Sequence, residues 1–205
     1  MTITTTSATV RPSAAADREA IATVLAGAFA DDPVFVWTIP DTERRAALLP
    51  GLFALFADVY QPIRASQAVV ASGAVAGAAL WAAPGTQAVA DEDAEAFASA
   101  VEGVCGADTG RLFEVIGLLE EQHPTEACYY LNLIGVDPAR RGRGLGSALL
   151  TAALARCDAE SIPAYLEATS PHNRRLYAGH GFEVVGEIAL PGGPSLWPMW
   201  REPRP

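Results

Sequence analysis

The chain has 205 residues, of which 50% are apolar and 19% are charged, and this composition predicts one folded domain with a full hydrophobic core rather than a disordered chain. The net charge is −10 and every basic residue is arginine, so the sequence lacks the cationic surface that nucleic-acid binding requires. The longest weakly polar run, residues 65–83, is interrupted by polar residues and glycines, which argues against a membrane span, and the first residues show no secretory-signal pattern.

The cysteine and histidine pattern indicates neither disulfide bonds nor a metal site. Cys105, Cys128 and Cys157 are an odd, widely spaced set without a Cys-x-x-Cys pair, which is typical of buried thiols in a reducing compartment. The three histidines are scattered along the chain and form no ligand cluster. We therefore expect a cytoplasmic protein without a metal ion.

The N-terminal half predicts a strand, two helices and a hairpin. The Thr-rich first six residues are expected to fray, whereas apolar residues at helical spacing and the potential N-cap Asp41 indicate two amphipathic helices. The expected elements are a strand at Ser7–Arg11, a helix at Asp17–Ala30, a loop at 31–40, a helix from Asp41 to about Tyr60, and a hairpin of strands Ala68–Ser72 and Ala74–Ala82.

The C-terminal half begins with a helical insert at residues 85–122, interrupted around 103–110, and continues with strands and helices. The expected elements after the insert are a strand at Tyr129–Val136, a helix at 144–160, a strand at 163–168, a short helix capped by Ser170 and ended by Gly181, and a hairpin of 182–190 and 195–200. This order predicts a single α/β (α+β) domain over residues 1–205 with a mixed sheet, and not a repeated βαβ unit.

The glycine-rich segment at 141–147 lies between the strongest predicted strand and a helix. Glycines at a helix N-terminus let backbone N–H groups approach a phosphate, and the helix dipole favours the anion. A nucleotide-binding P-loop is excluded because it needs a lysine, which the chain lacks. A dinucleotide fingerprint fits poorly, since the glycine spacing is G-x-G-x-G and only about 60 residues follow. A glycine-rich turn with incidental arginines is the structural alternative.

The spacing R-x-x-G-x-G at residues 141–146 resembles the R/Q-x-x-G-x-G/A motif of the GNAT N-acetyltransferase superfamily. Flanking residues that are similar to the same family in order and spacing are Leu133–Pro138, Asn173, Tyr177 and Gly181-Phe182. The predicted element order also matches, so the resemblance covers nearly the whole chain, with the insert as the least similar part. It implies a mixed, mostly antiparallel central sheet that is flanked by helices and splayed at the cofactor strand.

The same resemblance implies a site for acetyl-CoA as co-substrate. Ile134 and Val136 would offer backbone hydrogen bonds to the pantetheine arm, and the Val136 N–H would also serve as the oxyanion donor. The residues implied for cofactor binding are Ile134, Gly135, Val136, Arg141, Gly142, Arg143, Gly144, Leu145, Gly146, Ser147 and Asn173. Tyr177 would lie near the sulfur atom and protonate the leaving thiolate.

Acetyl transfer to an amine also needs a base and an acceptor pocket. Glu167 is the candidate base, because a charge inside an otherwise apolar strand is costly; a solvent-exposed or arginine-paired glutamate is the alternative. Weaker candidates for acceptor binding, each with a turn, core or surface-loop role as its alternative, are Asp31, Asp32, Trp81, His123 and Tyr130.

The sequence therefore predicts an acetyl-CoA-dependent N-acetyltransferase acting on the primary amine of a small molecule, by direct attack in a ternary complex. Outer segments, among them the tail Pro191–Met199, resemble the puromycin N-acetyltransferases, a drug-acetylating subgroup associated with antibiotic resistance. The alternatives are a protein or peptide N-acetyltransferase and a non-catalytic acyl-CoA-binding sensor domain. The C-terminal hairpin could also extend the sheet across a homodimer.

Overall fold

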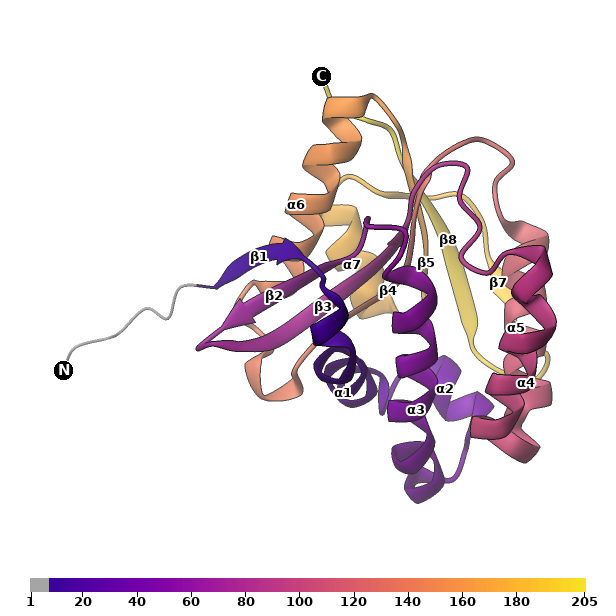
Figure 1. The fold of residues 1–205 in the computed structure, drawn as a ribbon. Coiled ribbons are helices and arrows are strands. Elements are labelled where there is room, and N and C mark those ends of the chain that lie inside the picture. Colours follow the sequence, from indigo (N-terminus) through magenta and orange to yellow (C-terminus); the bar gives the residue numbers. More distant parts are fainter. Residues whose placement is uncertain (1–7) are drawn as a thin grey trace.

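The computed structural model describes residues 8–205, which surround one open sheet (Figure 1). Ser7 of the first expected strand and the six residues before it lie outside the described residues. Hydrogen-bonded neighbours follow the order β1-β2-β3-β4-β5-β8-β6, and β7 also pairs with β8. The strands are β1 (Thr9–Pro12), β2 (Gln67–Ala71), β3 (Ala74–Ala82), β4 (Tyr129–Val136), β5 (Ala164–Ala168), β6 (Glu183–Val184), β7 (Ile188–Ala189) and β8 (Ser195–Arg201). Only β4 and β5 pair in parallel, which confirms the mixed, mostly antiparallel sheet.

Helices cover both faces of this sheet, and Figure 1 shows α1 and α3 on the near side with α6 and α7 behind. The helices are α1 (Arg18–Phe29), α2 (Pro33–Thr38), α3 (Thr42–Tyr60), α4 (Ala94–Cys105), α5 (Thr109–Gln122), α6 (Leu145–Glu160) and α7 (Pro171–Gly179), with short 3₁₀ turns at Ala15–Asp17, Asp91–Asp93, Gly106–Asp108 and Pro138–Arg140. The sheet alternates side chains between two cores, so Leu80 packs towards α1 and α3 whereas its neighbour Trp81 packs towards α6.

The helical insert is joined to the rest of the molecule by a third, smaller core. Val115 of α5 packs there with Val34 of α2 and with Ile188, Leu190 and Leu196 from β7, β8 and the turn between them. This contact places the C-terminal end of α5 beside the sheet, and the chain leaves that end at His123 to enter β4.

Two helix starts follow the capping signals in the sequence, and one helix was not expected. The Asp41 carboxylate accepts from the Arg44 N–H at 2.8 Å, and the Ser170 hydroxyl accepts from the Asn173 N–H at 3.2 Å. The loop expected at 31–40 is wrong, because it contains α2. Asp32 caps this helix by accepting from the Val34 N–H at 3.0 Å, and the Asp-Pro pair that marks its start is followed by too few residues to show a helical period.

The C-terminal hairpin also differs from the expectation. The single strand expected at 182–190 is divided into β6 and β7, with Val185 60% exposed between them. Pro198 lies in the middle of β8 and has no N–H to donate to a neighbouring strand. An uninterrupted ladder along this side of β8 is therefore not available, which accounts for the division.

The sheet opens between β4 and β5. These strands pair only from Tyr129 opposite Ala164 to Leu131 opposite Leu166; beyond this point β4 continues beside β3, and β5 beside β8. The expected splay at the cofactor strand is thus located at residues 132–136 of β4. Glu167 lies on β5 directly after Leu166, the last residue paired with β4, at the edge of this opening.

Candidate active site

The backbone of β4 presents hydrogen-bonding groups to the opening. The Asp137 N–H donates to Ala76 of β3 at 2.9 Å, and backbone groups alternate in direction along an antiparallel strand. The N–H groups of Ile134 and Val136 therefore face away from β3, towards the side where β5 has diverged. These are the two residues expected to offer backbone hydrogen bonds to the pantetheine arm.

Gly135 has a packing role between these two residues. A Cβ atom built on Gly135 would lie 2.7 Å from the Ala28 Cβ and 2.9 Å from the Leu25 Cδ2 of α1. Its missing side chain is what lets α1 approach β4. A direct part in cofactor binding could therefore come only from its backbone groups.

The glycine-rich loop turns the chain into α6 and leaves its backbone open. Gly142 and Gly144 have φ values of +74° and +76°, and no atom lies within 4 Å of a Cβ built at either position. The helix begins at Leu145, so the first N–H groups of α6, those of Leu145, Gly146 and Ser147, have no intrahelical acceptor. These donors and the positive end of the helix dipole suit a phosphate group.

Arginines fix this loop and give it charge. The Arg141 guanidinium donates from Nη2 to the Ala28 carbonyl at 2.9 Å, and Arg140 donates from Nη1 to the Ala71 carbonyl at 2.8 Å. Arg143 is exposed at the helix start. The open N–H groups and the exposed arginine therefore suit an anionic group such as a pyrophosphate.

Glu167 lies on β5 at the edge of the opening, in a group of aromatic side chains. Its Oε2 accepts from the Tyr130 hydroxyl at 3.0 Å, while its Oε1 is buried without a hydrogen-bond partner in the described residues. Burial raises the pKa of the Glu167 carboxyl to about 7, and the Tyr165 and Tyr130 hydroxyls, which stabilise the ionised form, oppose that rise. A carboxyl with this pKa exchanges protons near neutral pH.

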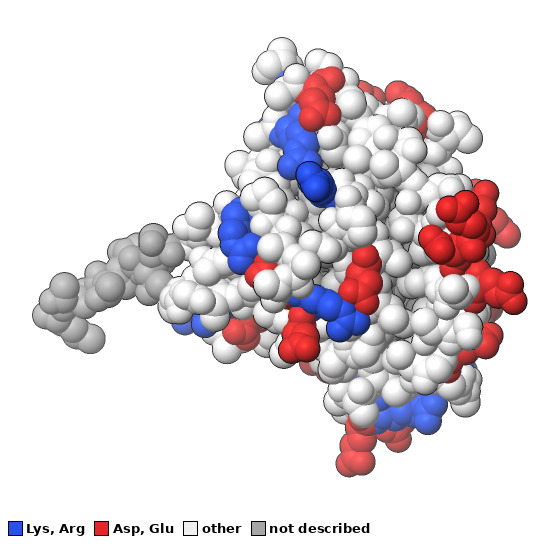
Figure 2. Space-filling model, viewed as in Figure 1, with Lys and Arg blue, Asp and Glu red and all other residues white. Residues whose placement is uncertain are grey.

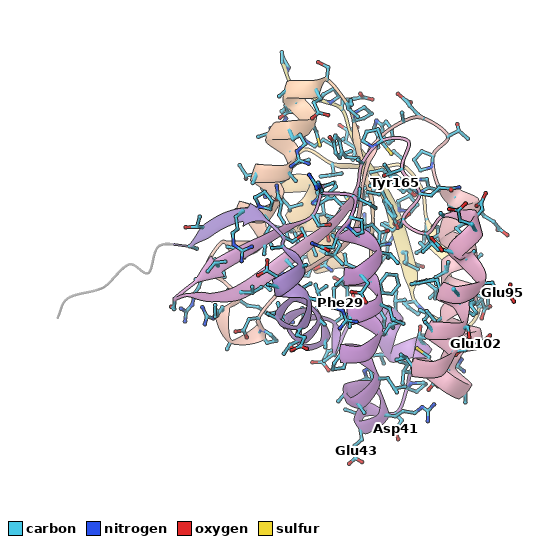
Figure 3. The ribbon with its side chains drawn as sticks, viewed as in Figure 1. Phe29, Asp41, Glu43, Glu95, Glu102 and Tyr165 are labelled. Carbon is cyan, nitrogen blue, oxygen red and sulfur yellow. The ribbon has the colours of Figure 1, made fainter. Side chains whose placement is uncertain are left out.

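Three tyrosines lie near this carboxyl, and a histidine packs against two of them. The His123 ring packs edge-on against Tyr130 and Tyr165, with centroids 4.8 and 5.4 Å apart. Burial, followed by the Glu167 charge, raises the pKa of Tyr60, Tyr130 and Tyr165, so their phenols stay protonated. Burial lowers the pKa of His123 and favours its neutral form. The expected acceptor residues His123 and Tyr130 therefore pack together beside Tyr165, which is labelled in Figure 3, and the Tyr130 hydroxyl connects them to the candidate base.

A second set of hydrogen-bonded polar side chains is centred on Thr169, two residues after Glu167. The Thr169 hydroxyl donates to Asp32 Oδ2 and accepts from Asn173 Nδ2 at 3.4 Å. Burial raises the pKa of the Asp32 carboxyl, whereas hydrogen bonds from Thr169 and from the first turn of α2 oppose the rise. Asp32 thus caps α2 and lies beside Asn173, one of the expected cofactor residues. Arg45 of α3 holds the preceding turn by donating to the Ala30 carbonyl at 2.7 Å.

Tyr177 of α7 lies close enough to Asp32 for the two side chains to interact electrostatically. It is only 6% exposed and packs edge-to-face against Phe182, with ring centroids 6.1 Å apart. Burial first, and then the charge of Asp32, raise the pKa of its phenol. Tyr177 therefore keeps its proton at neutral pH, as a proton donor must.

Two acceptor candidates lie outside both the tyrosine cluster and the polar group around Thr169. Trp81 is 1% exposed in the core on the α6 face, opposite Leu131, so its ring lies on the other side of the sheet from Tyr130. The expectation that it lines an acceptor pocket is not supported by this placement. Asp31 is exposed at the end of the α1 turn. Its neighbour Asp32 is the one that points inward.

Several residues at the site were missed by sequence reasoning. They are Tyr60, Asn132, Tyr165 and Thr169. Asn132 could have been identified from the sequence, since it is the one polar amide side chain inside the apolar strand 129–136. The others are ordinary residues of a helix, a strand and a loop, and only their interactions with Glu167 and Asp32 distinguish them.

Charge is divided between the two sides of the molecule. The insert at 85–122 carries nine acidic residues and one arginine, a net charge of −8 out of −10 for the whole chain. Figure 2 shows acidic side chains gathered over α4 and α5, and Figure 3 shows Glu95 and Glu102 on the outer surface of α4. The side of the molecule that carries the insert is therefore strongly negative, whereas the loop before α6 is rich in arginine.

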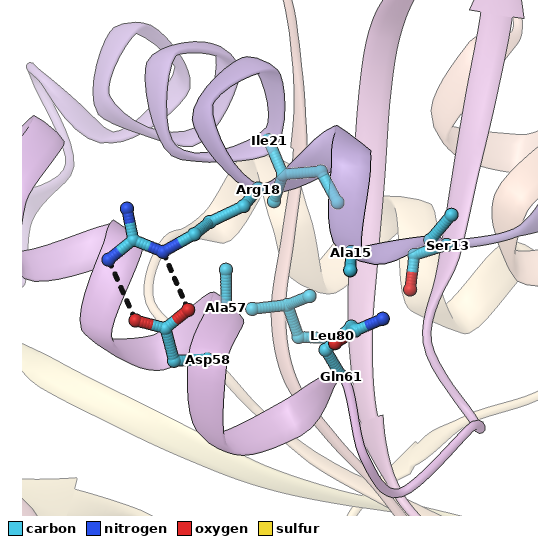
Figure 4. A pocket seen from close by; sticks show the side chains of 9 residues that line it. Ser13, Ala15, Arg18, Ile21, Ala57, Asp58, Gln61 and Leu80 are labelled. Carbon is cyan, nitrogen blue, oxygen red and sulfur yellow. Dashed lines mark hydrogen bonds and ion pairs between the residues drawn. The ribbon is translucent and has the colours of Figure 1, made fainter.

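The other features of the described residues offer no competing site. A small hollow between α1 and α3 is lined by apolar and small polar side chains, and its charged pair is exposed: Arg18 donates to Asp58 at 2.6 and 2.7 Å (Figure 4). In residues 8–205 no three His, Cys, Asp or Glu side chains are grouped as metal ligands would be. None of the helices described is both long and apolar enough to cross a bilayer.

Similarity to known proteins agrees with this geometry. The model of the acetyltransferase (GNAT) family matches residues 76–182. An uncharacterised N-acetyltransferase of Schizosaccharomyces pombe is 28% identical over 207 residues, which cover 92% of this chain and 81% of that protein. A Corynebacterium glutamicum structure described as histone acetyltransferase HPA2 and related acetyltransferase is 31% identical with a TM-score of 0.73, over 97% of both chains. Arylalkylamine N-acetyltransferase 2 of Aedes aegypti has a TM-score of 0.72 at 15% identity, over 96% of this chain and 99% of its own. The chain therefore belongs to the GNAT acetyltransferase family.

Proposed function

We propose that this protein transfers an acetyl group from acetyl-CoA to the primary amine of a small cationic molecule, by direct attack in a ternary complex. The observation that carries the proposal is Glu167, a buried carboxyl with a pKa of about 7 at the edge of the opening between β4 and β5. An amine must lose a proton before or during attack, and a base with a pKa near the working pH is the most effective acceptor for it.

Acetyl-CoA would supply the activated acetyl thioester. The open N–H groups at the start of α6 and the arginines of the loop would hold its pyrophosphate. The backbone N–H groups of Ile134 and Val136 would bind the pantetheine arm beside the opening, and Asn173 would contact the cofactor from α7. These roles follow from the family and from the free donors at these positions.

Three residues of the chain then carry out the proton and charge movements. Glu167 takes a proton from the amine nitrogen while the nitrogen lone pair attacks the acetyl carbon. The Val136 N–H stabilises the negative charge that develops on the carbonyl oxygen. Tyr177 donates its phenolic proton to the departing sulfur. Direct attack is favoured because Cys128, the cysteine whose thiol interacts with the Glu167 charge, is buried with its pKa raised to about 11, so it supplies no thiolate near neutral pH; the thiol of Cys157 is likewise buried with a pKa of about 11.

The charge distribution supports a cationic acceptor. The acidic insert ends at His123, beside Tyr130 and Tyr165, so its field would attract an ammonium group towards Glu167. Two neighbours in fold are named for small amines, the Aedes arylalkylamine enzyme and a polyamine N-acetyltransferase of Drosophila melanogaster with a TM-score of 0.63 at 16% identity. The resemblance of the outer segments to puromycin N-acetyltransferases adds an amino-nucleoside to the candidate acceptors.

The first experiment would follow thiol release from acetyl-CoA with puromycin, an aminoglycoside, spermidine, phenethylamine and a lysine-containing peptide, each against a control without acceptor. Release with a small amine and not with the peptide would support the proposal. Release with the peptide alone would instead assign a peptide acetyltransferase, which the name of the Corynebacterium relative and the acidic surface also suit. Acetyl-CoA binding in calorimetry without turnover on any acceptor would favour a sensor domain.

A matched pair of variants connects the activity to the site. Glu167→Gln removes the proposed base. Glu160→Gln changes a second glutamate with the same kind of partner, since Glu160 Oε2 accepts from the Tyr129 hydroxyl at 2.8 Å on the opposite face of the sheet. We expect turnover to fall by about a hundredfold or more only in Glu167→Gln. Equal activities of the two variants would contradict the assignment of the base.

The cytoplasmic location stays a prediction, as does a homodimer. The edge at β6 exposes Val184 and Val185, and a contact there would join two sheets. Size-exclusion chromatography with light scattering would separate a monomer from a dimer.

A further inference from the structure

Two of the four buried polar atoms that lack a hydrogen-bond partner in residues 8–205 lie in the candidate active site. The four are Gln67 Oε1, Trp81 Nε1, Asn132 Oδ1 and Glu167 Oε1. A buried acceptor without a donor is unfavourable by a few kcal/mol, so such atoms in a native protein need an explanation. The Asn132 and Glu167 oxygens share a neighbour, and both are acceptors.

The Tyr130 hydroxyl joins the two side chains and orients both. It donates to Glu167 Oε2 at 3.0 Å and accepts from Asn132 Nδ2 at 3.2 Å. The amide nitrogen of Asn132 is thereby used, which leaves its carbonyl oxygen as the free end. The hydrogen bond from the Tyr130 hydroxyl uses one carboxylate oxygen of Glu167, Oε2, and leaves the other, Oε1, without a donor. The two free oxygens thus belong to one connected group.

A bulge in β4 places Asn132 in this group. The β3–β4 register steps from Leu80 opposite Leu133 to Trp81 opposite Leu131, so Asn132 is an extra residue without a partner on β3. The bulge lies where β4 separates from β5, and it turns the Asn132 side chain to the face that carries Tyr130 and Glu167. With regular pairing, residues 130 and 133 would point to opposite faces of the sheet; both pack on the α1 and α3 side.

A single partner that satisfied both oxygens would need at least two donor hydrogens. A neutral primary amine has two N–H groups and one lone pair, so it can donate to two oxygens and still attack with the lone pair. A secondary amine has one N–H and can satisfy only one of the two oxygens. Glu167 needs that hydrogen, because it is the proton to be removed.

We propose that Asn132 Oδ1 binds the second N–H of the acceptor amine, beside Glu167, and so makes the enzyme selective for primary over N-methylated amines. This inference rests on the proposed function. Asn132 orients the nitrogen and does not exchange a proton with it. Tyr130 acts as a positioning residue, because it holds the amide and the carboxylate at fixed orientations.

The test compares kcat/KM for the primary amine that the protein acetylates fastest with kcat/KM for its N-methyl derivative. The native protein should prefer the primary amine by about tenfold or more, the effect of one buried acceptor left unpaired. Asn132→Leu keeps the shape and removes the acceptor, so the preference should fall to about twofold or less, mainly through slower turnover of the primary amine. Gln67→Leu is the matched control, since it also removes a buried unpaired amide oxygen, on another strand, and the preference should persist.

Three outcomes would overturn the proposal. Equal kcat/KM values for both amines in the native protein would do so without any variant. An undiminished preference in an Asn132→Leu protein that still binds acetyl-CoA would show that the methyl group is rejected by steric contact alone. A failure of the native protein to acetylate any amine would refute the proposed function and the inference together, whereas acetylation without preference would refute only the role of Asn132.

Discussion

Replacing Glu167 by glutamine should lower turnover by about a hundredfold or more and at the same time stabilise the fold at neutral and alkaline pH. A glutamate carboxyl ordinarily has a pKa of about 4.5, and burial raises the pKa of Glu167 to about 7 in the native state. Above the unfolded-state pKa, the unfolded chain releases this proton while the native protein still holds it. The native state then binds more protons, so its stability falls as the pH rises through the interval between the two pKa values.

The loss of stability caused by Glu167 can be calculated from the difference between its pKa values in the unfolded and native states. A difference of about 2.5 pKa units, at about 1.36 kcal/mol per unit, corresponds to roughly 3 kcal/mol of native-state stability lost between about pH 4.5 and pH 7. Glutamine carries no titrating proton, so the Glu167→Gln variant does not lose this stability. For a chain of this size, the difference is equivalent to a shift in Tm of about 5 to 10 °C.

Urea unfolding of the native protein and of Glu167→Gln, at about pH 5 and about pH 8, measures the effect. Other titrating groups contribute equally to both proteins, so the difference between them isolates Glu167. We expect this difference to move by about 2 to 3 kcal/mol in favour of the variant between the two pH values. Activity is followed in parallel, and kcat/KM of the native protein should rise with pH and level off near pH 7, the pKa of the proposed base.

A stability difference that does not depend on pH would refute this reasoning, because Glu167 would then titrate alike in both states. A native protein whose activity shows no rise towards pH 7 would refute the role of Glu167 as the base. The two results are independent. A shifted pKa with unchanged activity would leave Glu167 as a buried carboxyl without a part in the chemistry.

Two further predictions concern the acid and the packing under the cofactor strand. Tyr177→Phe should lower kcat by about a hundredfold while the Kd for acetyl-CoA in calorimetry stays the same, because only the proton for the departing sulfur is lost; an unchanged kcat would contradict the assignment. Gly135→Ala should destabilise the protein by about 1 to 3 kcal/mol in urea unfolding, since the new Cβ would lie 2.7 Å from the Ala28 Cβ. Gly117→Ala, in α5 where nothing lies within 4 Å of the new atom, is the control and should be neutral or stabilising; equal losses in both variants would refute the packing argument.

Much of the fold could be predicted because its signals are local. The caps at Asp41 and Ser170, the apolar strand at 129–136 and the glycines before α6 each act on the residues next to them. Their helices and strand start within a residue or two of the expected positions. The errors, α2 and the divided hairpin, occur where a short segment has no room for a period or where a proline in β8 limits a strand far along the chain.

The sequence alone indicated the family, a candidate cofactor loop and the two residues proposed for proton transfer, because all of these signals lie in one contiguous stretch, residues 129–182. Only the tertiary structure decided what surrounds Glu167. Tyr60, His123, Tyr130 and Tyr165 come from four different segments, and their packing excludes water from the carboxyl and raises its pKa. The sequence marked Asn132 as a polar residue in an apolar strand but could not show that it faces Tyr130, because a bulge arises from the mismatch between two paired strands. Burial and pairing depend on distances through space, and residues far apart in the chain set those distances together.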